Sequence, residues 1–147
     1  MSLSKARRDL LNRVAERNEE EALAALRAAE ARLAEATALH GELGRYLDDY
    51  QRRPVAVPNP MILENQRQFL AKLDEALSAQ ARAIEAANGR VAVAREAWLA
   101  TRRELRIAHL LDEQGAAEDR RVADRRSQRE MDEFALTRHA AAGAARP

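Results

Sequence analysis

The side chains that carry most catalytic and metal chemistry are sparse and scattered in this sequence. The three histidines stand far apart, and none belongs to a His-x-x-x-His or Glu-x-x-His pair of the kind that binds zinc. The serines stand at positions 2, 4, 78 and 127, and none has a neighbouring histidine that could activate it as a nucleophile. No glycine-rich loop ends in Lys-Ser or Lys-Thr, as phosphate-binding loops do. Adjacent carboxylates such as Asp48 and Asp49 fit a solvated helix face better than an acid–base pair, so we predict a protein that is not an enzyme and needs no cofactor or metal.

The composition excludes several further classes of protein. Of the 147 residues 33% are charged and 3% are aromatic, yet the net charge is only +1. Abundant alanine, glutamate, arginine and leucine are typical of long helices rather than of a layered globular core. The balanced charge disfavours a nucleic-acid-binding protein, which usually shows a basic excess. Cysteine is absent, and no signal-peptide or membrane-span pattern occurs, so we expect a soluble, cytoplasmic protein.

A heptad repeat of apolar residues is the strongest structural signal. One row runs through the second half of the chain: Leu63, Leu70, Leu77, Ile84, Val91, Trp98 and Leu105. This spacing puts the row, here called position a, on one seam of a helix that needs a partner helix. The first half supplies weaker rows, at Leu26, Leu33, His40 and Leu47 and at Ala29, Ala36, Leu43 and Tyr50. We predict an all-α fold, a long antiparallel two-helix coiled-coil hairpin.

Helix-breaking and helix-capping residues set the predicted boundaries. Ser4 can cap the first helix, and Asn59 followed by Pro60 is a helix-start signal. The predicted segments, all in a single coiled-coil domain over 1–147, are a helix over about 5–51, a Pro-rich loop over 52–60, a helix over about 60–138 and a disordered tail over 140–147.

A short connection makes the two helices antiparallel neighbours. Placing Tyr50 beside Leu63 sets a register that pairs Lys5 with Ala108. The second helix then overshoots the first by about 30 residues, or roughly 45 Å at 1.5 Å per residue. Polar residues interrupt the seam at Glu19, His40, Gln66, Gln80 and Thr101, and Asn88-Gly89 interrupts the second helix. We interpret these as tolerated in a marginal hairpin, with local bending as the alternative.

Apolar and aromatic residues gather on one flank of the seam near the loop. Position g holds Leu39 and Tyr46 in the first helix, and Ile62, Phe69 and Ala76 in the second. Positions e and g of a solvated coiled coil are usually charged, and an apolar flank often marks a partner site. We favour a binding site here, and the alternative is that these residues only widen the core.

The other end of the hairpin is rich in arginine. Arg7 and Arg8 lie in the first turn of the first helix, where cations oppose the helix dipole. The overshooting segment mixes arginines with acidic residues, which fits a solvated face or a docking surface for an acidic partner. Met131 and Phe134 lie beyond the end of the seam, which is easier to explain if a partner covers them.

Four short motifs keep a characteristic order and spacing over nearly the whole chain. They are Tyr46-Leu47-Asp48-Asp49-Tyr50, Gln68-Phe69, Trp98 followed by basic residues, and Met131-Asp132-Glu133-Phe134-Ala135. In these motifs the chain resembles the FliJ family, the small coiled-coil component of the bacterial flagellar type III export apparatus. The resemblance implies a non-enzymatic antiparallel coiled coil similar to the central stalk of rotary ATPases.

The resemblance also implies partners and a location. The end that carries both termini would insert into the hexameric export ATPase and promote ring assembly, and the loop-proximal face would contact the transmembrane export-gate protein. Members also bind export chaperones, and they work in the cytoplasm at the inner face of the bacterial cell membrane. The implied export-gate positions are Leu39, Leu43, Tyr46, Tyr50, Phe69, Leu73, Ala76 and Gln80. The implied ATPase-facing positions are Arg7, Arg8, Leu11, Arg120, Arg121, Arg125, Met131 and Phe134.

Other functions remain open from the sequence. The equivalent stalk protein of a virulence type III injectisome shares the architecture and differs in partners. A structural spacer would use the apolar flank to close a homodimer, and a nucleic-acid-binding hairpin is third, disfavoured by the balanced charge.

Overall fold

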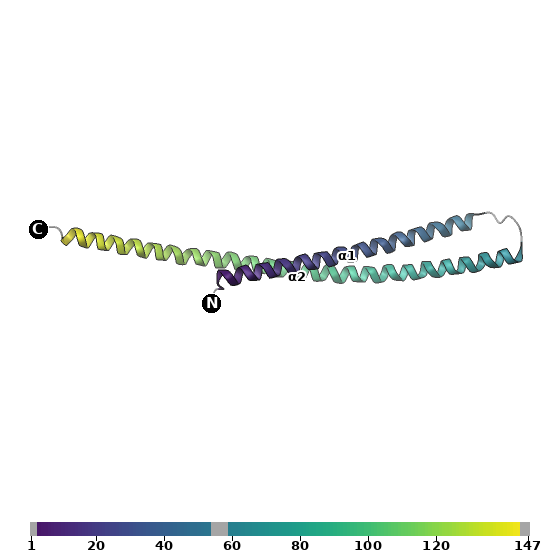
Figure 1. Ribbon diagram of the computed structural model, residues 1–147, viewed down its shortest axis with the longest axis horizontal. Coiled ribbons are helices and arrows are strands. Elements are labelled where there is room, and N and C mark those ends of the chain that lie inside the picture. The colour runs from purple at the N-terminus through teal and green to yellow at the C-terminus, as the bar shows by residue number, and fades with distance from the viewer. Residues whose placement is uncertain (1–2, 54–58, 145–147) are drawn as a thin grey trace. The chain divides into compact units, whose positions relative to one another are not determined.

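Two long helices make up the part of the chain that the computed structural model describes, residues 3–53 and 59–144. Helix α1 spans Lys5–Arg52 and helix α2 spans Pro60–Ala144 (Figure 1). The helices pack against each other, and no strand occurs among the described residues. The predicted all-α helical hairpin is confirmed.

The start of each helix has the predicted cap. The backbone N–H of Arg7 donates to the hydroxyl oxygen of Ser4 at 3.3 Å. The backbone N–H of Met61 donates to the side-chain oxygen of Asn59 at 3.0 Å, with Pro60 at the first helical position. These caps satisfy N–H groups that have no partner inside the helix, which explains why α1 and α2 begin where they do.

The carboxyl end of α2 differs from the prediction. The helix continues to Ala144, although we expected an end near residue 138 and a disordered tail over 140–147. The run Ala140–Ala142 explains the difference, because alanine has the highest helix propensity and a single glycine at position 143 comes too late to end the helix earlier. Residues 145–147 and most of the predicted Pro-rich loop, residues 54–58, lie outside the described residues. The pair Asn88-Gly89 does not interrupt α2.

The chain divides into two compact units. Unit 1 contains Met1–Arg17 and Arg102–Pro147, and unit 2 contains Asn18–Thr101. Each unit pairs a stretch of α1 with a stretch of α2. The single domain over 1–147 stays a prediction.

The seam of unit 2 follows the predicted heptad rows. Its buried apolar residues are Leu26, Leu73, Ala87 and Val91. The half-buried row members are Ala29, Leu33, Ala36, His40, Leu43, Leu47 and Tyr50 in α1 and Leu70, Leu77, Ile84 and Trp98 in α2. Burial thus recurs every third and fourth residue on both helices, which confirms the predicted seam. Leu63, the first member of the predicted a row, is the exception, because it is 47% exposed.

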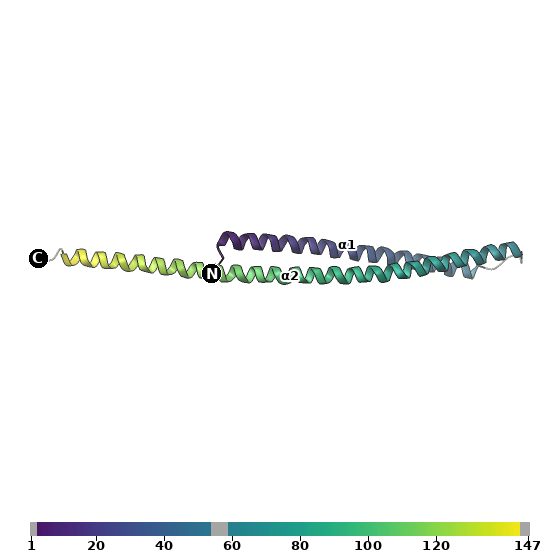
Figure 2. The same ribbon diagram turned by 90° about the horizontal axis from the view of Figure 1, so that it is seen from below.

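The register of unit 2 lies about one heptad further along α2 than predicted. Tyr50 packs on Phe69 with ring centroids 4.8 Å apart, so the end of the α1 seam lies about one heptad beyond Leu63. The indole N–H of Trp98 donates to the Glu19 carboxylate at 2.9 Å, a contact between the other ends of the two stretches, so the helices run antiparallel (Figure 2). The prediction was wrong because it assumed that the first turns of α2 already pair with α1.

Unit 1 continues the same spacing with different residues. Its seam places Arg8, Asn12 and Ala15 of α1 against α2, where Ala108 and Gly115 are buried. Arg8 bonds to Asp112, whereas the predicted register, which paired Lys5 with Ala108, would have put Arg8 near Leu105. From residue 119 to residue 144 every side chain of α2 is exposed, and Asp119 at the start of this segment is bonded to Arg8 of α1.

Candidate partner-binding surfaces

Three aromatic rings form the centre of the predicted export-gate surface in unit 2. Phe69 lies between Tyr46, at a centroid distance of 6.1 Å, and Tyr50, at 4.8 Å. The Tyr46–Phe69 pair is edge-to-face and the Tyr50–Phe69 pair is tilted, which are arrangements that aromatic rings favour. The structure therefore brings together three residues that the sequence placed on two helices, and we call them the aromatic cluster.

The other predicted gate residues differ in how far a partner could reach them. Leu39 is exposed, like Tyr46 and Phe69, whereas Leu73 is buried. The half-buried members are Leu43, Tyr50, Ala76 and Gln80. Leu73 can therefore support the aromatic cluster from beneath, and the exposed members can contact a partner.

The first turns of α2 extend this apolar surface. Met61 and Ile62 are exposed next to Leu63. A hollow of about 680 Å³ runs along the same part of α2, and Leu63, Gln66 and Leu70 are among the residues that line it. These are seam positions, and the hollow reaches from the first turn of α2 to Asp74, beside the part of α2 that packs on α1.

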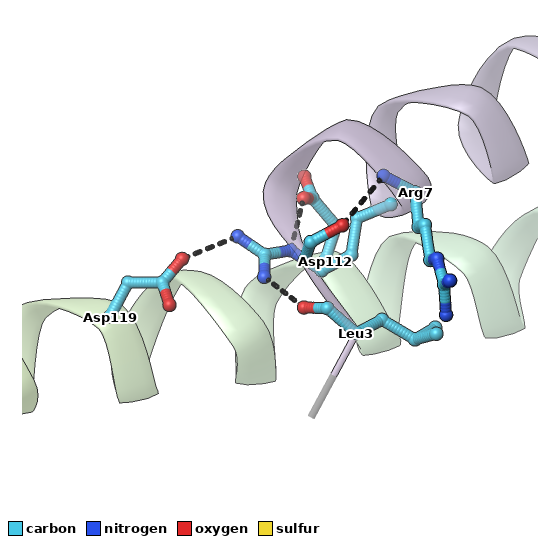
Figure 3. Close-up of polar contacts among 6 residues, drawn as sticks. Leu3, Arg7, Asp112 and Asp119 are labelled. Carbon is cyan, nitrogen blue, oxygen red and sulfur yellow. Dashed lines mark hydrogen bonds and ion pairs between the residues drawn. The ribbon is translucent and has the colours of Figure 1, made fainter. Parts of the chain in front are cut away.

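The predicted ATPase-facing residue Arg8 is not a surface residue, because its side chain is only 3% exposed. Its Nη2 donates to Asp119 at 2.7 Å, its Nε to Asp112 at 3.2 Å, and its Nη1 to the carbonyl of Leu3 at 2.7 Å, contacts that Figure 3 draws as dashed lines to these labelled residues. The hydrogen bond to Asp119 raises the pKa of Arg8 above its ordinary value, burial opposes the rise, and Asp112 adds to it. Arg8 therefore bonds α1 to α2 within unit 1 and offers little surface to a partner.

The remaining predicted residues of this end are exposed. They are Arg7, Leu11, Arg120, Arg121, Arg125, Met131 and Phe134. Met131 is 64% exposed and Phe134 is 69% exposed, which is high for such large apolar side chains. Met131 lies roughly 24 Å along α2 from Gly115 at 1.5 Å per residue, so it stands apart from the start of α1.

Unit 1 also carries exposed apolar residues that the site prediction missed. Together with Leu11 they form what we call the apolar collar: Leu10, Leu11, Val14, Ile107, Leu110 and Leu111. Leu10 and Leu110 occupy f positions, which point away from the seam on each helix. The sequence feature that could have predicted the collar is a set of apolar residues at outer heptad positions, where charged residues are usual.

Neither a membrane span nor a metal centre is found in the described part of the chain. No helix there has a stretch that is both long and apolar enough to cross a membrane. No group of three or more histidine, aspartate or glutamate side chains among the described residues is arranged to hold a metal ion.

Comparison with known protein families matches residues 4–144 to FliJ, described as the flagellar FliJ protein. No curated protein and no solved structure matches the chain. The family match covers almost the whole sequence, including both helices and the motifs near Tyr46 and Met131. The chain therefore belongs to the flagellar FliJ protein family, and by that membership it is a component of the flagellar type III export apparatus.

Proposed function

We propose that this protein is the stalk and coupling component of the export apparatus. It binds the hexameric export ATPase, promotes hexamer formation, binds the transmembrane export-gate protein and escorts export chaperones. It works in the cytoplasm at the inner face of the cell membrane, held there by its partners. The observation that carries this proposal is that each unit has its own exposed apolar surface, the aromatic cluster in unit 2 and the apolar collar in unit 1.

The aromatic cluster supports gate binding. Tyr46 and Phe69 are exposed large side chains at flanking positions, which elsewhere in unit 2 hold mostly small or polar residues. Aromatic residues carry much of the binding energy at protein interfaces. The buried Leu73 and half-buried Tyr50 hold the exposed rings in place, which lowers the entropy lost on binding.

The apolar collar supports binding to a ring. Leu10 and Leu110 point away from each other, so a flat partner could cover one of them and not both. A ring that encloses both helices could cover the two together. The exposed segment of α2 that carries Met131 and Phe134 offers further apolar contacts to the same partner.

The experiment is ATP hydrolysis by the cognate export ATPase, with rings counted by electron microscopy. The full-length protein should raise turnover and the number of hexamers. The double variant Leu10→Ser with Leu110→Ser should need roughly tenfold more protein for the same effect. Val93→Ser is the matched control, because Val93 is an exposed valine in unit 2. Equal stimulation by the collar variant and the control would rule out the collar as the ATPase-facing surface.

A truncation separates the collar from the exposed end of α2. A chain that ends at Arg121 keeps Asp119 and therefore the contacts of Arg8. We expect normal pairing of unit 1 and reduced ATPase stimulation, because Met131 and Phe134 are lost. Full stimulation by this fragment would assign ATPase binding to the collar alone.

The family match supports the flagellar apparatus over the virulence injectisome. The spacer alternative makes a different prediction, a stable homodimer closed by the apolar flank. Light scattering of the full-length protein distinguishes the two, because the stalk proposal expects a monomer.

A further inference from the structure

The seam of unit 1 holds fewer large apolar residues than the seam of unit 2, and Leu105 on α2 is a half-buried one. On α1 it has Arg8, Asn12 and Ala15, and on α2 it has Ala108 and Gly115 among its buried residues. An alanine can shift by one heptad at little cost in buried area, because its side chain is a single methyl group. Apolar packing inside unit 1 therefore favours one register only weakly, and the continuous helices also carry the register of the unit 2 seam into unit 1.

Arg8 contacts two carboxylates at once in the observed register only. Its guanidinium bonds to both Asp112 and Asp119, which are one heptad apart on α2 and are labelled in Figure 3. A shift of α1 by one heptad toward the predicted register would put Arg8 near Leu105 and away from both carboxylates. A shift the other way would leave Asp112 facing Ala15. Either shift breaks at least one of the two ion pairs, and the shift toward the predicted register leaves the buried Arg8 without either carboxylate, which is costly.

Gly115 makes room for this arrangement. A Cβ atom at position 115 would lie 2.5 Å from the Cδ, Nε and Nη1 atoms of Arg8. The four other glycines, at 41, 44, 89 and 143, have nothing within 4 Å of the same position. Glycine lowers helix stability, so its presence in the middle of α2 is explained by the side chain that crosses it.

We propose that Arg8, Asp112, Gly115 and Asp119 form a register lock that, together with the seam of unit 2, sets the axial position of α1 on α2 in unit 1. Arg8 is buried, whereas the Asp112 and Asp119 side chains are 40% and 59% exposed, so these ion pairs add little net stability. Polar residues in the seam of a coiled coil can instead specify its register. The lock is a property of the chain itself and does not depend on any partner or on the proposed function.

Pairs of introduced cysteines test the lock, because the natural chain contains no cysteine. Asn12→Cys with Ala108→Cys reports the observed register. Asn12 lies one turn after Arg8 on α1 and Ala108 lies one turn before Asp112 on α2, so the two positions face each other when Arg8 faces Asp112. Lys5→Cys with Ala108→Cys reports the register shifted by one heptad. Each pair is placed in the otherwise unchanged chain, in Gly115→Ala, and in the double variant Arg8→Met with Asp112→Leu. The matched control is Gly89→Ala, the same change on α2 where space is open.

The ratio of the two disulfide-formation rates is the readout, with melting followed by circular dichroism in parallel. We expect the first pair to react at least roughly tenfold faster in the unchanged chain and in Gly89→Ala. The ratio should fall in both lock variants, while the melting temperature of Arg8→Met with Asp112→Leu stays level or rises.

Two results would overturn the proposal. An unchanged ratio in both lock variants would mean that other contacts set the register. Loss of both disulfides in the lock variants would mean that Arg8 is a simple stabilising contact, without which unit 1 does not pair.

Discussion

Units 1 and 2 share one heptad geometry and place their apolar residues differently. In unit 2 several large apolar side chains, such as Leu26, Leu73 and Val91, are buried in the seam. In unit 1 the buried seam residues are alanines, Gly115 and Arg8, Leu105 is half-buried, and the leucines of the collar lie outside. Burial therefore stabilises unit 2, whereas polar contacts specify unit 1 and leave its apolar surface free for a partner.

The largest expected effect comes from the seam of unit 2. Leu73→Ala should lower the free energy of unfolding by about 2 kcal/mol, because it removes buried methyl groups and leaves a cavity. Leu110→Ala makes the same chemical change on the outside of unit 1 and should change it by less than about 0.5 kcal/mol. Urea denaturation followed by circular dichroism measures both. Equal losses would contradict the contrast between the two units.

The next effect concerns binding through unit 2. Tyr46→Ala with Phe69→Ala should weaken binding to the cytoplasmic part of the gate protein by at least roughly tenfold, because it removes two aromatic contacts. Val93→Ala, an exposed change in the same unit, should leave binding unchanged. Calorimetry measures the affinity, and circular dichroism checks the fold. A collapse of helicity in the double variant would mean that the aromatic cluster is core.

A smaller effect concerns the polar contact inside the seam of unit 2. Trp98→Phe removes the hydrogen bond from the indole to Glu19 and should cost about 1 kcal/mol of unfolding free energy. Glu19→Gln keeps an acceptor for the indole and should cost less. Thermal melting of the two variants shows which of them loses more stability. A larger loss in Glu19→Gln than in Trp98→Phe would show that the carboxylate charge matters more than the hydrogen bond.

The smallest expected effect is that of pH on unit 1. The pKa of Arg8 is raised in the folded protein, chiefly by the hydrogen bond to Asp119. A raised pKa means that the contribution of Arg8 is fully present below the ordinary arginine pKa and is lost only as the pH rises through the folded value. We therefore expect the methyl NMR signals of Ala15 and Ala108 to stay at their buried positions from neutral to mildly alkaline pH. Movement of these signals in mild alkali would contradict this account.

Much of the fold could be predicted from local rules. The heptad rows, the caps at Ser4 and Asn59 and the break before Pro60 depend on residue type and spacing alone. The register could not be predicted in the same way, because a heptad repeat looks alike after a shift of seven residues. The helical end at residues 140–144 was not predicted, because a run without a seam resembles a frayed tail although its alanines favour the helix.

The candidate surfaces also combine features that local rules predict with features that depend on the register. The flank position of Tyr46 and Phe69 followed from their heptad letters, whereas their contact with each other depends on the register. By its place in the first turn Arg8 resembles a surface cation, and only its pairing with α2 shows that it is buried.

The sequence by itself determined that this chain forms two long helices, which of their faces meet, and the family to which it belongs, because these depend on periodicity and motifs along one chain. The tertiary structure alone decided which residues stand opposite each other across the seam. That choice depends on contacts between distant residues, such as Arg8 with Asp119, whose energies no local pattern contains.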